Sequence, residues 1–264
     1  MAAPSIHVGI GGWDFDPWRG TFYPPGLAKT KQLEFAGTHL TAIEINATHY
    51  KLQRPELFQR WAASVPDGFT FAIKASRFCT NRTKLADGGE GIAKFCAQGI
   101  TELGDKLGPI LWQFMPHKHF DPEDFGGFLK LLPKSQDGVR LRHALEPRHE
   151  SFQTPAFVEM ARDAGAAIVF ADSDKYPAIA DVTADFTYAR LQRCREEIAT
   201  GYDDAALDRW AELARDWATG HQPSGLAYVG DRNAAKTPRD AFVFFIAGAK
   251  VRAPAAALAL IGRL

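Results

Sequence analysis

Short runs rich in β-branched and aromatic residues alternate with helical patterns along nearly the whole of this 264-residue chain. Such alternation is typical of parallel α/β folds, because each strand needs a helix to return the chain to the same edge of the sheet. The runs that predict strands are residues 6–11, 41–46, 69–75, 109–114, 142–146, 166–172, 186–191 and 242–247.

Helical patterns fill most of the intervals between these strands. Two of the helices have clear starts, because Asp121 and Thr154 each stand as a capping residue before a proline. The connection over residues 173–185 is too short and irregular to predict a full helix. The predicted helices are residues 29–39, 56–64, 92–105, 122–132, 155–164 and 205–219.

Two architectures fit eight such strands, an open doubly wound sheet and a closed barrel. The open sheet usually has a glycine-rich phosphate turn and a helix after its first strand, but Gly9, Gly11 and Gly12 lack that spacing and no helix follows them directly. Barrels of this length commonly form one domain, so we expect a single (β/α)₈ TIM-like barrel over residues 1–264. Residues 221–240 are rich in Gly, Pro, Asn and charge and predict a surface insertion before the last strand, with room for a short hairpin arm.

Charge and cysteine usage limit the class of partner. Lysine and arginine (31) balance aspartate and glutamate (31), so no global field attracts nucleic acid or an anionic membrane. The three cysteines form neither a CxxC pair nor a disulfide framework, and no secretory signal or membrane-length apolar run is evident. We therefore expect a cytoplasmic monomer without a membrane or nucleic-acid partner.

Polar residues stand at the carboxyl ends of the predicted strands, where barrels of this type carry their active sites. On the second strand Ile43 and Ile45 face the helices, which turns Glu44 inward. The same alternation turns Lys74 inward on the third strand. The polar set expected at this end is Glu44, Asn46, Lys74, Gln113, Glu146, Arg148, Asp172, Tyr188 and Arg190.

Six motifs occur in order along the chain: VGIGGWDFDPWRGTFYP (8–24), AIEINATHYKL (42–52), FTFAIKASRFCTN (69–81), LGPILWQF (107–114), ALEPRHESF (144–152) and YARL (188–191). Together they resemble the YecE-like family, domain of unknown function 72. The resemblance implies a TIM-like barrel and no established reaction. Two departures stand out: Thr80-Asn81 replaces the family's threonine-histidine, and FFIAGAKVRAP (244–254) replaces an acidic end of the last strand, so Lys250 and Arg252 stand in its place.

The convergence of acidic and basic groups predicts an enzyme, an isomerase, lyase or hydrolase, that performs general acid–base chemistry on a small polar anionic compound. Such a compound would be sugar-like or phosphorylated. Glu44 and Glu146 would transfer protons with His149 as a helper, while Lys74, Arg148 and Arg190 would hold or polarise anionic oxygens.

Other residues are expected to form the walls of this site. Trp13 and Arg19 follow the first strand, Tyr50 and Asn46 follow the second, and Trp13 and Trp18 would serve equally well as a packed lid. The loop after the last strand predicts a separate anion site at Gly248, Lys250 and Arg252, because Pro254 begins a helix whose free amides point outward.

Two alternatives remain open. Glu44, Glu146, Asp172 and His149 would suit a divalent metal and a phosphodiester hydrolase acting on nucleic acid, but Lys74, Arg148 and Arg190 would crowd a cation, so no metal or cofactor is predicted. The other alternative is a non-catalytic, ligand-binding barrel whose charged ring is a closed salt-bridge network.

Overall fold

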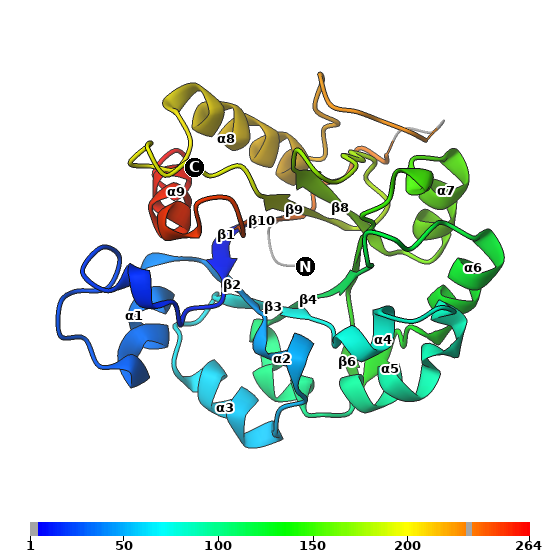
Figure 1. The fold of residues 1–264 in the computed structure, drawn as a ribbon, viewed down its shortest axis with the longest axis horizontal. Coiled ribbons are helices and arrows are strands. Elements are labelled where there is room, and N and C mark those ends of the chain that lie inside the picture. Colours follow the sequence, from blue (N-terminus) through cyan, green and yellow to red (C-terminus); the bar gives the residue numbers. More distant parts are fainter. Residues whose placement is uncertain (1–4, 231–233) are drawn as a thin grey trace.

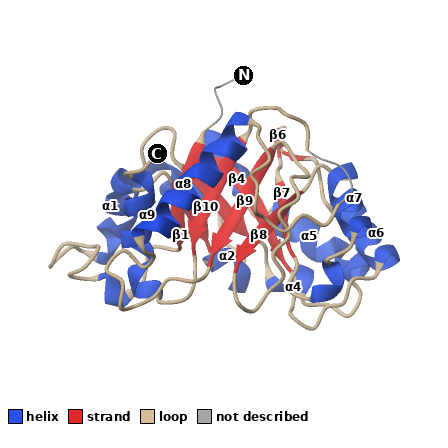
Figure 2. Ribbon diagram, turned by 90° about the horizontal axis from the view of Figure 1, so that it is seen from above, coloured by secondary structure: helices blue, strands red, loops and turns tan. Residues whose placement is uncertain are grey.

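Eight parallel strands form a closed barrel, as the sequence predicts (Figures 1 and 2). The computed structural model describes residues 5–230 and 234–264. Around the barrel the strands follow the order β1-β10-β9-β8-β7-β4-β3-β2, and β5 (Ser135–Gln136) pairs with β6 (Val139–Arg140) in a separate antiparallel ribbon. The barrel strands are β1 (Ile6–Gly11), β2 (Ala42–Ile45), β3 (Thr70–Lys74), β4 (Leu107–Gln113), β7 (His143–Glu146), β8 (Ala167–Asp172), β9 (Phe186–Leu191) and β10 (Asp240–Phe245).

Helices cover the outside of the barrel (Figure 1). The two predicted caps are confirmed. The Asp121 carboxylate accepts hydrogen bonds from the backbone amides of Glu123 and Asp124, and the Thr154 hydroxyl accepts one from the backbone amide of Phe157. The helices are α1 (Gln32–His39), α2 (Ala47–Tyr50), α3 (Pro55–Ala63), α4 (Arg77–Thr80), α5 (Gly89–Cys96), α6 (Pro122–Leu131), α7 (Pro155–Asp163), α8 (Asp204–Thr219) and α9 (Ala253–Ile261).

The single helix predicted over residues 92–105 is wrong. The chain leaves α5 and adopts φ +100° at Gly99, where a Cβ atom would lie 2.7 Å from Cα of Pro55. A 3₁₀ segment, Ile100–Lys106, then leads into β4. The close approach of α3 breaks the helix, and periodicity in the sequence carries no sign of it.

The insertion before β10 is a loop in its described part, and the hairpin arm does not form there. The amides of Val229 and Gly230 donate to the carboxylate of Asp181, at 2.7 and 3.0 Å, and the amide of Ala180 donates to the carbonyl of Ala227. These bonds fix the loop to the connection between β8 and β9, which contains no helix, as predicted. Residues 231–233 of the predicted insertion lie outside the described residues.

Alternation along the strands sorts the apolar residues into two layers. The outer layer, which includes Ile43, Ile45, Phe71 and Ile73, packs between the strands and the helices. The inner layer fills the inside of the barrel below its mouth, where the mouth is the end formed by the carboxyl ends of the strands. It consists of Ala42, Ala72, Leu111, Ala144, Ala167, Val169, Phe186, Tyr188, Phe242 and Phe244. We call this inner layer the apolar floor. Below it, Arg142 pairs with Asp240 at 2.8 Å and lies over the rings of Phe186 and Phe242.

The first glycine of β1, Gly9, allows close packing of two strands. Gly9 pairs with Ala42 of β2, and a Cβ atom at Gly9 would lie 1.9 Å from the Ala42 carbonyl oxygen. Gly12 turns the chain out of the strand at φ +72°. None of the helices in the described residues is both long and apolar enough to cross a membrane.

Candidate active site

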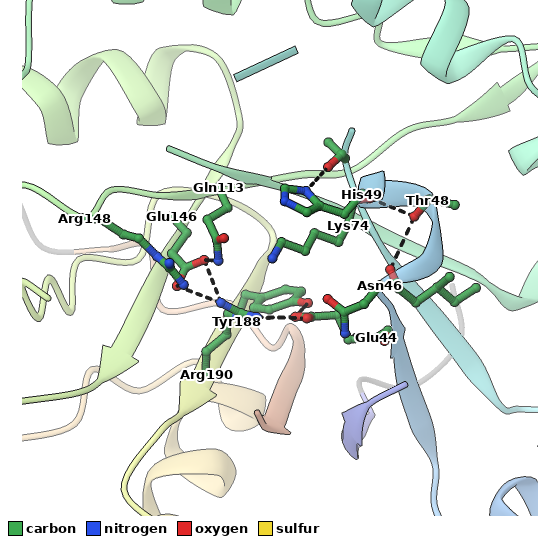
Figure 3. Close-up of polar contacts among 12 residues, drawn as sticks. Glu44, Asn46, Thr48, His49, Lys74, Gln113, Glu146, Arg148, Tyr188 and Arg190 are labelled. Atoms are coloured by element: carbon green, nitrogen blue, oxygen red, sulfur yellow. Dashed lines mark hydrogen bonds and ion pairs between the residues drawn. The ribbon is translucent and has the colours of Figure 1, made fainter. Parts of the chain in front are cut away.

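Arg190 of β9 is the centre of a buried ionic network with Glu44 and Glu146, which we call the ring (Figure 3). Its Nε and Nη2 atoms donate to the two carboxylate oxygens of Glu44, at 3.0 and 2.9 Å. Its Nη1 atom donates to both oxygens of Glu146, at 2.8 and 2.7 Å. Arg190 is 2% exposed and both carboxylates are fully buried, so one guanidinium joins β2 to β7 across the barrel.

Three further side chains complete this network. The Tyr188 hydroxyl donates to Oε2 of Glu44 at 2.8 Å, Gln113 donates to Oε2 of Glu146 at 2.5 Å, and Nη2 of Arg148 lies 3.4 Å from Oε1 of Glu146. Burial alone would raise the pKa of Glu146, but the charges of Arg190 and Arg148 outweigh it and lower that pKa. Burial and the Glu44 charge raise the pKa of Tyr188, which therefore stays a hydroxyl.

Lys74, at the end of β3, points into the same space without a direct partner. Its side chain reaches toward Glu146 and Gln113 (Figure 3), and its Nζ atom makes no hydrogen bond or ion pair within residues 5–230 and 234–264. Only 9% of the residue is exposed. Burial first, and then the charge of Arg190, lowers the pKa of Lys74 to about 8 against the opposing effect of Glu44 and Glu146.

The backbone around Lys74 is held by the turn that follows β2. The Thr48 hydroxyl donates to the Lys74 carbonyl at 2.8 Å, and Nδ1 of His49 lies 2.8 Å from the Ala75 carbonyl. Burial, followed by the charge of Lys74, lowers the pKa of His49. His49 is not among the site residues expected from the sequence, where its one signal is a position four residues after the end of the strand that carries Glu44.

A cavity of about 510 Å³ opens above Lys74 and Arg190 at the carboxyl ends of the strands. Its cationic groups are Lys74, Arg148, Arg190 and Lys250, whereas its acidic group, Asp14, is paired with Lys29 at 2.7 Å. The cavity is lined by Gly11, Gly12, Trp13, Asp14, Asn46, Ala47, Tyr50, Lys74, Gln113, Arg148, Arg190, Ile246 and Lys250. Because Arg190 is neutralised by two glutamates, the remaining charge of the lining is positive.

Arg148 and Lys250 are both held loosely over aromatic rings. The Arg148 guanidinium carbon lies 4.3 Å from the ring centre of Tyr176, and its Nε is buried without a partner among the described residues. Lys250 Nζ lies 4.7 Å from the ring centre of Phe15 and 5.4 Å from that of Trp18. Among the described residues Lys250 forms no ion pair and Arg148 forms one, at 3.4 Å with Glu146, so both keep donors for an anion in the cavity.

The aromatic residues of the first loop divide between wall and lid. Trp13 lines the cavity and packs edge-on against Trp61. Trp18 is fully buried, and its indole nitrogen donates to the Lys250 carbonyl at 3.0 Å, so it joins the first loop to the last. Tyr50 is 64% exposed at the rim.

Asp172 does not join the ring, which corrects the sequence prediction. Ala167 and Val169 face inward on β8, so Asp172, three residues further along, faces the outer layer. There its carboxylate accepts from the Tyr202 hydroxyl at 2.8 Å and lies 3.4 Å from Nε of Arg193.

Arg19 and His149 also lie outside the lining of the cavity. Arg19 is exposed and pairs with Asp16 at 3.3 Å. His149 caps the short segment Glu150–Phe152, where its Nδ1 accepts from the Ser151 amide at 3.2 Å, and its ring centre lies 3.8 Å from that of His119.

The residues of the predicted anion site do not converge. Gly248 turns the chain at φ +77°, Lys250 lines the cavity above Lys74, and Nε of Arg252 donates to the Glu196 carbonyl at 2.8 Å. The amides of Ala249, Lys250 and Arg252 donate to carbonyl groups of the chain itself.

The four residues weighed as metal ligands are also dispersed. Arg190 occupies the space between Glu44 and Glu146, Asp172 faces outward and His149 is a cap. Among the residues that the structure describes, no group of three or more His, Cys, Asp and Glu side chains has a metal-binding arrangement.

Comparisons with known proteins agree with this fold. A family model described as "Protein of unknown function DUF72" matches residues 7–264. The chain is 27% identical over 160 residues to UPF0759 protein YunF of Bacillus subtilis (strain 168), covering 58% of this chain and 54% of that protein. It is 27% identical over 142 residues to UPF0759 protein YecE of Escherichia coli (strain K12), covering 52% and 48%. The chain thus spans about half the length of the curated relatives it matches.

A solved structure extends the likeness over nearly the whole chain. The crystal structure of a DUF72 family protein from Thermotoga maritima MSB8 superimposes with a TM-score of 0.74 and 20% identity, over 98% of both chains. At that identity the likeness shows the shared barrel fold. With the family model matching residues 7–264, the chain belongs to the DUF72 family of proteins of unknown function.

Proposed function

We propose that this protein is an enzyme that acts on a small polar anion by acid–base chemistry at the barrel mouth, with Lys74 as its central reactive group. The observation that carries the proposal is Lys74, a buried residue that lines a cavity of about 510 Å³ and whose amine has no direct partner among the described residues. Burying an amine without an ionic partner is costly, and barrels usually fill this space with apolar side chains. An amine that is buried there despite this cost in free energy is a candidate catalytic group.

The proton-transferring role falls to Lys74 and not to the glutamates. Each carboxylate of the ring accepts two hydrogen bonds from Arg190, so neither has a free, mobile proton. With a pKa of about 8, Lys74 exists as the neutral amine in about one molecule in ten at pH 7. A group divided in this way between its two protonation states can both accept and donate a proton at physiological pH.

Arg148 and Lys250 are the groups that would bind the anion. Both line the cavity; Lys250 has no carboxylate partner among the described residues, and the only ion pair of Arg148 there is its 3.4 Å contact with Glu146. Trp13 and Tyr50 add aromatic walls to the same cavity, which suits the apolar face of a sugar. A carboxylate or phosphate group held by the two cations would bring the rest of a compact ligand over Lys74.

A purely structural ring is the competing explanation. The Glu44–Arg190–Glu146 part of the network is fully paired and fits that explanation. Two observations do not fit it: the Nε atom of Arg148 is buried without a partner, and Lys74 Nζ has no hydrogen-bond or ion-pair partner among the described residues. Most polar groups inside a purely structural network are paired.

The test is a thermal-shift screen with phosphate, sugar phosphates and small hydroxy and keto carboxylates. A ligand at about a hundredfold excess over its Kd adds roughly 2.7 kcal/mol of stability, which is readily detected. We expect at least one class of anion to raise Tm, and Arg148→Met with Lys250→Met to abolish the rise. Arg19→Gln removes a cation outside the cavity and should keep the full response.

Catalysis is tested with whichever anion binds. Incorporation of deuterium from D₂O into that compound, followed by NMR, reports proton transfer directly. We expect the wild-type protein to catalyse exchange and Lys74→Met to lose it. Absence of any Tm shift, or equal exchange by Lys74→Met, would contradict the proposal and favour the structural ring.

A further inference from the structure

The Lys74 amine is placed as a nucleophile as well as a proton carrier. Both carboxylates of the ring are held by Arg190, and their remaining contacts are with Tyr188, Gln113 and Arg148. Among the described residues, no carboxylate therefore forms an ion pair with the Lys74 nitrogen. The nitrogen lone pair is free to face the cavity whenever the amine is neutral.

We infer that Lys74 forms a covalent imine with the carbonyl carbon of an anionic aldehyde or ketone bound in the cavity. This inference rests on the proposed function, since it requires the cavity to bind a small anion, and it names the class of that anion. The buried amine lies at the base of the cavity, while Arg148 and Lys250 line the same space. A compact keto acid or aldehyde phosphate can meet both kinds of group at once.

The step balances with the groups at hand. The neutral amine adds to the carbonyl carbon, and the C–N bond forms as the C=O π bond opens. The nitrogen gives one proton to the oxygen, and the resulting hydroxyl group leaves as water with a second proton from solvent. The product is a protonated imine on Lys74. It attracts electrons from the neighbouring carbon, which weakens the bonds there to hydrogen or carbon.

The protein around Lys74 favours formation of the imine at this residue over formation at an exposed lysine. At pH 7 a pKa of about 8 makes the neutral fraction of Lys74 greater than that of an ordinary surface lysine by about two orders of magnitude. The apolar floor and the fully buried ring lie beneath the amine. Burial on that side limits the water that would hydrolyse the imine.

Reductive trapping tests the inference. The intact protein is incubated at pH 7 with glyoxylate or glyceraldehyde 3-phosphate and sodium cyanoborohydride, and the adduct is located by intact mass and peptide mapping. We expect one adduct per chain, on the peptide that contains Lys74, in excess of surface lysines by about tenfold or more. Inorganic phosphate should compete with the trapping.

Matched variants separate the site from general lysine reactivity. Lys74→Arg keeps the positive charge but has no nucleophilic amine, so the single adduct should disappear. Lys94→Arg changes an exposed lysine that pairs with Glu90 and should leave trapping unchanged. Adducts spread evenly over surface lysines, or an adduct that persists in Lys74→Arg, would overturn the inference.

The outcome also distinguishes this inference from the proposed function. Anions that raise Tm through Arg148 and Lys250 without any Lys74 adduct would overturn the imine and leave acid–base chemistry standing. If no anion raises Tm and no adduct forms, both fail.

Discussion

The Nη1 atom of Arg190 lies 2.8 and 2.7 Å from the two carboxylate oxygens of Glu146, and neither side chain has more than 2% of its surface exposed. The same guanidinium holds Glu44, so one cation is shared by two buried anions. Arg148, at 3.4 Å from Glu146, supplies a weaker second compensation. The stability of the barrel mouth depends on that arrangement.

Removing the Arg190 guanidinium should strongly destabilise the fold. In Arg190→Met the two glutamates lose their partner, and breaking a buried pair in this way costs about 3–5 kcal/mol. Urea unfolding at pH 7 measures the loss, and Arg190→Lys, which keeps the charge but not the planar fork, should show a smaller one. Arg193→Gln removes a half-exposed arginine paired with Asp172 and Asp174 and should cost about 1 kcal/mol at most. Equal losses in Arg190→Met and Arg193→Gln would contradict this account.

Replacing Lys74 with an apolar side chain should stabilise the protein while removing its function. Lys74→Met relieves the burial of a charged amine, and we expect a gain of about 1–3 kcal/mol in the free energy of unfolding at pH 7. The folded pKa of about 8 lies below the unfolded value, so the unfolded chain binds more protons between these values. Wild-type stability therefore rises with pH through that window, and the advantage of Lys74→Met shrinks from pH 7 to pH 10. Lys94→Met, on the surface, is the control and should show neither the gain nor its pH dependence.

Gly9→Ala should disrupt the contact between β1 and β2. Its Cβ would lie 1.9 Å from the carbonyl oxygen of Ala42, so the strands must separate, at a cost of about 3 kcal/mol. Gly262→Ala adds a methyl group whose nearest neighbour is 3.6 Å away and should change stability by no more than about 0.5 kcal/mol. Differential scanning calorimetry of the two variants makes the comparison, and similar Tm values would show that the barrel tolerates the close approach.

Acidification should destabilise the protein through His143. Burial lowers the pKa of His143 against the opposing hydrogen bond with the Pro133 carbonyl, and Trp112 donates to its Nδ1 at 3.0 Å. Below about pH 6.5 the unfolded chain takes up a proton that the folded protein resists, so stability falls as the pH drops.

The variant His143→Gln keeps an acceptor for Trp112 but does not titrate. It should be less stable than the wild type by about 1–2 kcal/mol at pH 8, and that difference should narrow toward pH 5 in urea titrations. His7 and His49, whose pKa values are also lowered, contribute equally to both proteins. A difference that stays constant with pH would contradict the assignment.

Much of the fold and of the central ring could be predicted from the sequence, because large apolar residues alternate with charged ones on β2 and β3. In the run Phe71–Ala72–Ile73–Lys74 only one register buries the bulky side chains outside the barrel, and it turns Lys74 inward, as observed. Strand β8 offers no such contrast. Its residues are apolar on both faces up to Asp172, so the sequence does not reveal that this carboxylate faces outward.

The pairing within the ring could not be predicted by any local pattern. Arg190 and Glu44 are separated by 146 residues, and their contact depends on how β9 and β2 face each other across the closed barrel. The sequence predicts that these charges converge and that Arg190 binds an anion, whereas in the structure Arg190 pairs with two glutamates. For His149 the deciding contact is local: its Nδ1 accepts from the Ser151 amide, two residues away, and His149 does not line the cavity.

The apolar floor has a consequence for anything that enters the cavity. Phe242, Phe244 and their neighbours close the barrel from below, and the Arg142–Asp240 pair lies beneath them. In the described part of the barrel, water therefore approaches the ring from the mouth. A ligand seated over Lys74 displaces that water and leaves the amine in contact with protein and ligand alone. When a ligand replaces the water, the effective dielectric constant around the ring falls. Each charge of the ring then acts more strongly on the bound ligand than it would across a water-filled cavity.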